Sequence, residues 1–185
     1  MIDKTMSFLL GELNTFLGTV FPTGEPHAVL SDLASPDGGL PPGTDNKIVL
    51  TLVNIERDGI AYSPEAASGN LRLSAPLNLN LYILLSANFP ASYADALRLL
   101  SSAIGFLQTK PGFTPSSGAG FPRGLERLTL EIVNLGVHEL HQIWTITGVR
   151  YRPSILYKAR MITIGGGWIS ERLPAVTATD PRIAG

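Results

Sequence analysis

The stretch LHQIWTITGVRYRPSILYKARMITI, residues 140–164, decides the second half of the fold. Its first part predicts a helix that ends at Gly148, because glycine readily takes the left-handed conformation that closes a helix. A short basic and aromatic turn follows, and Ser154 begins a predicted strand. No catalytic motif has this form. A large indole, two tyrosines and three arginines around one proline turn favour packing or docking over a reaction centre.

Outside this stretch, periodic segments alternate with loops rich in proline and glycine. Helical spacing predicts further helices over 2–20 and 92–109, with Leu97, Leu100, Ile104 and Leu107 as the buried stripe of the second. Strand patterns cover 47–57, 77–85 and 125–133, and a short one falls within 27–33. We therefore expect one α+β domain over residues 1–164, with a mixed or antiparallel sheet of four to five strands packed with about three helices. Residues 165–185 are expected to form a flexible tail.

The composition favours a subunit of an assembly. The formal net charge is -1, which supplies no basic field for nucleic acid. There are no cysteines, and charged residues make up 16% of the chain against about 25% in typical domains. Mean hydropathy is +0.20, although no apolar run approaches the roughly 20 residues that span a bilayer. The alternative is a monomer with a modestly apolar surface. The first residues do not resemble a signal peptide.

Motifs that suggest chemistry lack the context that the chemistry needs. His138 and His141 are three residues apart, whereas the zinc protease motif places two histidines four apart on one helical face. Two solvated or interfacial histidines near a helix start are therefore the favoured interpretation. The glycine runs at 38–43 and 165–167 are followed by no predicted helix that could hold a phosphate. We expect no enzyme, no cofactor and no metal.

The aromatic and basic cluster leaves two interpretations open. Its side chains could contact a partner or neighbouring subunit, where Arg, Tyr and Trp are enriched, or they could form an internal core and hinge. A stacking platform for nucleic acid is a third possibility that the net charge argues against. The candidate interface residues are Trp144, Arg150, Tyr151, Arg152, Tyr157 and Trp168.

The order and content of several blocks resemble a known family. Besides the opening amphipathic helix, the blocks are IVLTLVNIERDG (48–59), APLNLNLYILLSANF (75–89), ALRLLSSAIGFLQ (96–108), LTLEIVNLGVHELHQIW (128–144) and YRPSILYKARMITI (151–164). Over about residues 1 to 164 the chain resembles the cap, or tail-terminator, proteins of phage-tail-like extracellular contractile injection systems.

The resemblance implies a structural role and no enzymatic activity. It implies a tail-terminator-like fold and a homohexameric ring that ends the inner tube, binds the last sheath layer and fixes particle length. The implied partners are sheath and inner-tube proteins, without nucleic acid or membrane. The resemblance also implies that the chain is a component of a particle that is assembled in the cytoplasm and released from the cell. The rival hypothesis is a generic adaptor or small-ligand-binding domain with a pocket near Trp144 and Tyr151.

Overall fold

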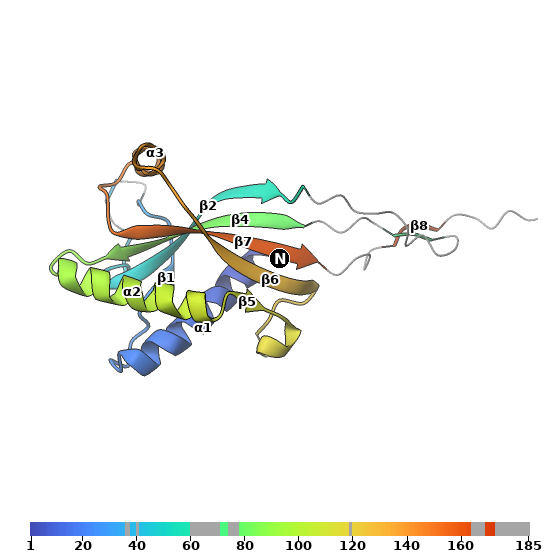
Figure 1. Ribbon diagram of the computed structural model, residues 1–185, viewed down its shortest axis with the longest axis horizontal. Helices are drawn as coiled ribbons and strands as arrows, with labels where there is room; N and C mark the ends of the chain where they lie inside the picture. Colours follow the sequence, from blue (N-terminus) through green and yellow to red (C-terminus); the bar gives the residue numbers. More distant parts are fainter. Residues whose placement is uncertain are drawn as a thin grey trace, which may run out of the picture.

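The computed structural model describes residues 1–35, 38–39, 41–59, 71–73, 78–118, 120–163 and 169–172 (Figure 1). The helices in these residues are α1 (Ile2–Val20), α2 (Tyr93–Thr109), α3 (Val137–Thr147) and the short 3-10 helix η1 (Pro115–Ser117). The strands are β1 (Ala28–Leu30), β2 (Lys47–Arg57), β3 (Leu71–Leu73), β4 (Leu79–Asn88), β5 (Gly112–Phe113), β6 (Leu125–Val133), β7 (Ser154–Thr163) and β8 (Ile169–Arg172). Within the described residues, no helix is both long and apolar enough to cross a bilayer.

One sheet organises the domain. Its strand order is β1-β2-β4-β7-β6-β5, with β1 parallel to β2 and every other pair antiparallel. This mixed sheet with its helices confirms the predicted α+β class. The predicted count of four to five strands was one too low, because β5 has only two residues and therefore shows no alternation.

A second sheet joins segments that are far apart in sequence. Strand β3 pairs antiparallel with β8. The sequence pattern predicted neither strand. The flexible tail expected over 165–185 stays a prediction, because only the backbone of β8 is described there, and Trp168 lies outside the described residues.

Helices α1 and α2 cover one face of the large sheet, below it in Figure 1. The stacked rings of Phe16 and Phe106, with centroids 4.7 Å apart, join the two helices. The predicted stripe of α2 was wrong at Leu97, whose side chain is 43% exposed. The buried stripe instead uses two alanines, which carry little hydrophobic signal, and its members are Ala96, Leu99, Leu100, Ala103 and Leu107.

Helix α3 lies on the opposite face, above the sheet in Figure 1. A smaller core forms there from Leu33, Val49, Leu84, Trp144 and Leu156. Strands β2 and β4 contribute to both cores, because neighbouring strand residues point to opposite faces. Strand β2 is therefore an inner strand covered on both sides, although its last four residues, 54–57, are exposed.

Candidate interaction site

Helix α3 is defined by its two ends. The Glu139 carboxylate accepts a hydrogen bond from the Gly136 N–H at 2.7 Å, which satisfies one of the free donors at the helix start. At the other end Gly148 has φ 68°, the left-handed conformation that the sequence predicted. The helix is 11 residues long, and Trp144 is its one buried side chain. Trp144 is therefore the deepest contact of α3 with the sheet, and the half-buried Leu140 and Ile143 pack beside it.

Trp144 points into the subunit. Its side chain is 5% exposed and packs in the smaller core. The ring of Tyr151, which is 58% exposed, meets the indole edge-on with centroids 5.6 Å apart. The indole N–H has no hydrogen-bond partner among the residues that the structure describes. Trp144 thus contributes by packing rather than by a polar contact.

Tyr157 lies on the other face of the sheet from Trp144. It is 2% exposed and belongs to the core beneath α1 and α2, whereas its neighbour Leu156 faces α3. Its hydroxyl is buried and, in the described part of the chain, unpartnered. Burial raises the pKa of Tyr157 above its ordinary value of 10.0, because the interior disfavours the phenolate. The sequence placed these two aromatics in one cluster, and the structure separates them.

We expect Tyr157→Phe to raise the free energy of unfolding by about 1 kcal/mol, since it removes a buried hydroxyl that has no partner. Because its pKa is raised, Tyr157 in the folded chain keeps its proton at a pH where the same tyrosine in the unfolded chain loses it. The free energy of unfolding is therefore unaffected by this ionisation below about pH 10 and falls as the pH rises further. Urea unfolding of both proteins at about pH 8 and about pH 11 tests this. An equal alkaline loss in wild type and variant would contradict it.

The turn between α3 and β7 is partly exposed. Arg150 and Tyr151 are open to solvent, and Arg152 is half-buried. Burial lowers the pKa of Arg152, and the nearby Asp45 carboxylate opposes that shift. The Ala87 N–H donates to the Pro153 carbonyl at 2.9 Å, which ties the turn to the end of β4. Whether these residues contact a partner stays a prediction.

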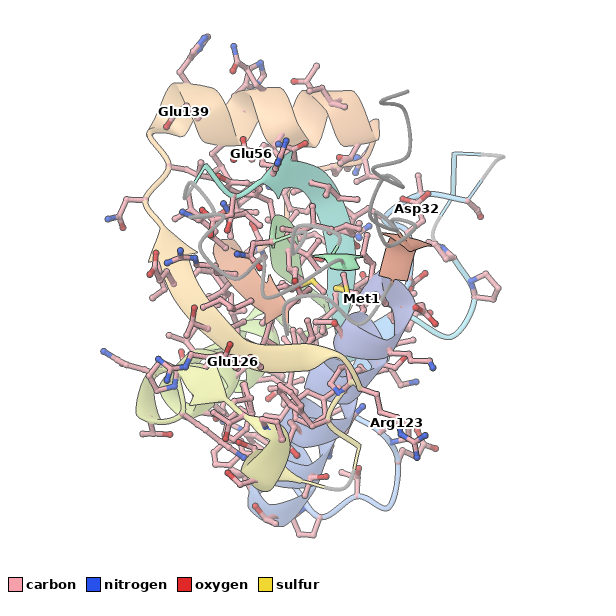
Figure 2. All side chains as sticks on the ribbon, turned by 90° about the vertical axis from the view of Figure 1, so that its right-hand side faces the viewer. Met1, Asp32, Glu56, Arg123, Glu126 and Glu139 are labelled. Carbon is pink, nitrogen blue, oxygen red and sulfur yellow. The ribbon has the colours of Figure 1, made fainter. Side chains whose placement is uncertain are left out.

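A groove lies between α3 and the sheet. Its volume is about 580 Å³. Ile143, Ile146 and Thr147 of α3 form one wall, and β2, β4 and β7 form the floor. Figure 2 shows Glu56 below α3 and Asp32 at the side of the molecule; both line this groove. No sequence motif pointed to it, since its lining comes from five separate segments: the loop at 32–34, β2, β4, α3 and β7.

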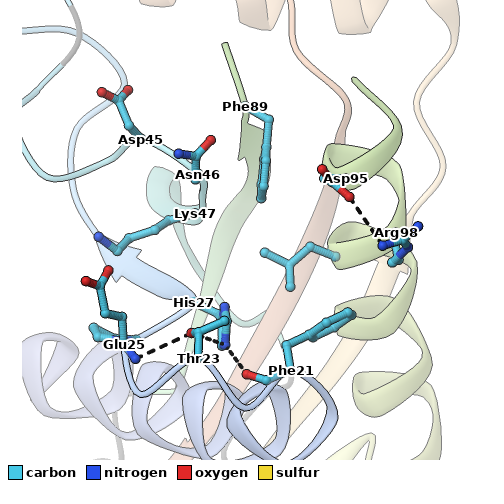
Figure 3. Close-up of a pocket in the computed structure, with 12 residues that line it drawn as sticks. Phe21, Thr23, Glu25, His27, Asp45, Asn46, Lys47, Phe89, Asp95 and Arg98 are labelled. Carbon is cyan, nitrogen blue, oxygen red and sulfur yellow. Dashed lines mark hydrogen bonds and ion pairs between the residues drawn. The ribbon is translucent and has the colours of Figure 1, made fainter. Parts of the chain in front are cut away.

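A second hollow, of about 350 Å³, lies where α1 ends and α2 begins (Figure 3). Acidic and basic side chains alternate around it, and Arg98 forms an ion pair with Asp95 at 3.3 Å. The His27 ring nitrogen Nε2 is 2.6 Å from the Phe21 carbonyl. Asp95, Arg98 and His27 in this hollow thus contact neighbours within the fold. The mixed charges of the hollow favour no one class of ligand.

Asn88, the last residue of β4, holds the loop at Thr44 and Asp45 that borders this hollow. Asn88 is 2% exposed, and its side-chain nitrogen lies 3.1 Å from the carbonyl and from the hydroxyl of Thr44. The same nitrogen is 3.3 Å from an oxygen of Asp45. A buried amide that contacts a loop in this way positions the loop, and hence the residues of the hollow, against the sheet end.

A third hollow, of about 600 Å³, lies beside α1 and includes Glu12 and Arg123. Glu12 already pairs with Lys110 at 2.6 Å. The two histidines of α3 are exposed, and each contacts the residue four positions later: His138 contacts Gln142, and His141 contacts Thr145. Of the features described, only the α3 groove combines exposed apolar groups with charge of one sign.

Comparison with known proteins gives a family and two similar structures. The family model described as the Pvc16 N-terminal domain matches residues 6–178. The chain is similar to the sheath/tube terminator of an extracellular contractile injection system, PVC, solved in the extended state. They share 17% identity over 94% of this chain and 63% of that chain, with a TM-score of 0.49. It is also similar to the tube-terminating cap of the anti-feeding prophage (AFP), with 16% identity over 91% of this chain and 59% of that chain, and a TM-score of 0.48.

The chain spans less than two thirds of the length of either solved protein. A search of curated proteins finds no significant match.

Proposed function

The chain belongs to the Pvc16 N-terminal domain family, and from this premise we propose that it is a structural cap, or tail terminator, of a contractile injection system. The observation that carries the proposal is the family match over residues 6–178, nearly the whole chain. The sequence blocks described above resemble cap proteins of the same kind of particle. In this role the chain is a component of a particle and not an enzyme.

We propose further that the chain forms a homohexameric ring, ends the inner tube, binds the last sheath layer and thereby fixes particle length. A ring closes when a head-to-tail interface returns to its start, so that no edge remains for growth around the ring. Growth along the axis then stops if the outer face of the ring differs from that of a tube or sheath subunit.

The surface of the subunit supports a role in an assembly. The side chains of Val137 and Ile146, at the two ends of α3, are 87% and 86% exposed, and Tyr151 in the turn that follows the helix is 58% exposed. Exposed large apolar residues along one element are suited to a surface that other proteins cover. The low charge of the chain fits the same explanation.

The α3 groove favours one alternative, a small-ligand-binding or adaptor domain, because its volume lies in the range of ligand sites. The two functions predict different masses in solution. The cap should give a species of six times the 19.8 kDa subunit mass at high concentration, as measured by light scattering after size exclusion. A stable monomer at every concentration that binds small apolar molecules would contradict the ring and support the alternative.

A further inference from the structure

The outer edge of β2 is open beyond the short strand β1. Strand β1 pairs only with Ile48, Val49 and Leu50 of β2, and no described strand pairs with that edge farther along. The Asp58 N–H donates to the Asn78 carbonyl on the β4 side at 2.9 Å. Successive residues of a strand direct their backbone groups to opposite edges, so Ile55 and Arg57 direct theirs away from β4.

The open edge is flanked by exposed apolar side chains on both faces of the sheet. Ile146 of α3 stands over the groove on one face and is 86% exposed. Ile55, paired with Leu81, lies on the other face and is 45% exposed. Side chains of an added strand would point alternately to the two faces, so a single strand could cover both isoleucines.

The charge of the groove is negative. Asp32 and Glu56 line it, and its described lining contains no Lys, Arg or His. Glu56 is held in place, since its carboxylate accepts a hydrogen bond from the Tyr82 hydroxyl at 2.7 Å and lies 3.4 Å from the Asn54 side-chain nitrogen. That hydrogen bond to the carboxylate raises the pKa of Tyr82. A fixed carboxylate beside an apolar floor is suited to a basic side chain.

We propose that the α3 groove and the adjoining edge of β2 form a docking site for an extended segment of a partner protein, in which apolar side chains alternate with Lys or Arg. The segment would add a strand beside residues 54–57, place its apolar side chains against Ile55 on one face, and direct its cations to Glu56 and Asp32 on the other, with their aliphatic stems across Ile146. A bulge between Leu52 and Asn54 ends the regular edge, so the added strand is short.

Other occupants fit the same surface less well. Two copies of this chain joined edge to edge would bring two acidic grooves together, and their carboxylates would repel each other. A partner with basic side chains avoids this repulsion. The phosphates of a nucleic acid would be repelled by the same carboxylates. The inference goes beyond the capping role and does not require it.

The test uses a fluorescein-labelled hexapeptide of alternating lysine and valine, titrated with the whole chain and followed by fluorescence anisotropy at low salt. We expect saturable binding, and none by a hexapeptide of alternating glutamate and valine. Methylation of alternate backbone nitrogens should abolish binding, because it removes the hydrogen bonds of the added strand. Equal binding of the acidic or the methylated peptide would overturn the proposal.

Variants of the protein locate the peptide. Glu56→Gln should weaken binding about threefold, the range of an exposed ion pair. Ile146→Ala should weaken it about fivefold, because it removes apolar contact with the aliphatic stems of the lysines. Glu131→Gln is the matched control: Glu131 is exposed on the same face of the sheet but does not line the groove, and its removal should leave affinity unchanged.

Equal loss in Glu56→Gln and Glu131→Gln would overturn the site. Sedimentation velocity tests whether a second copy of the chain occupies the site instead. A dimer that cannot bind the peptide, and that dissociates in the Ile146→Ala variant, would contradict the proposed basic partner segment. Failure of peptide binding leaves the ring mass unaffected, so the groove and the capping role are tested separately.

Discussion

Replacing Trp144 by alanine should lower the free energy of unfolding by about 3–5 kcal/mol, the usual cost of removing a buried tryptophan. The side chain is 5% exposed and is the one buried residue that α3 provides. Its loss leaves a cavity against Val49, Leu84 and Leu156 and removes the deepest contact of the helix with the sheet. Urea unfolding followed by circular dichroism measures the change.

Two variants give this experiment its controls. Ile146→Ala on the same helix should change the free energy of unfolding by no more than about 0.5 kcal/mol, because its side chain is 86% exposed. Trp144→Phe should recover much of the loss, since the indole N–H has no partner in the part of the chain described. A cost below about 1 kcal/mol for Trp144→Ala would show that α3 is held by other contacts.

The elements were predictable where one periodicity ran without interruption. Strand β2 over Lys47–Arg57 has the bounds that the sequence indicated, and helix α3 ends at Thr147, directly before the predicted closing residue Gly148. The buried face of α2 was less predictable, because Ala96 and Ala103 allow close approach to the sheet without a hydrophobic signal of their own. Strand β5 was missed because its two residues pair only through tertiary contact with β6.

The burial of the two aromatics could have been read from spacing. Trp144 is four residues after Leu140 and follows Ile143, which is the inner stripe of a helix. Tyr157 is two residues before Ala159 in a strand, which places both on one face. The groove could not be read in this way, because it depends on where β1 stops and on how α3 lies across the sheet.

The central claim is that the chain caps a contractile tail. Its most direct test is deletion of the gene in a strain that makes the particles, followed by electron microscopy of particle lengths. A cap that ends the tube predicts tails of variable length with unfinished ends, because nothing then stops addition along the axis. Expression of the wild-type chain should restore one uniform length. Particles of normal, uniform length in the deletion strain would contradict the account.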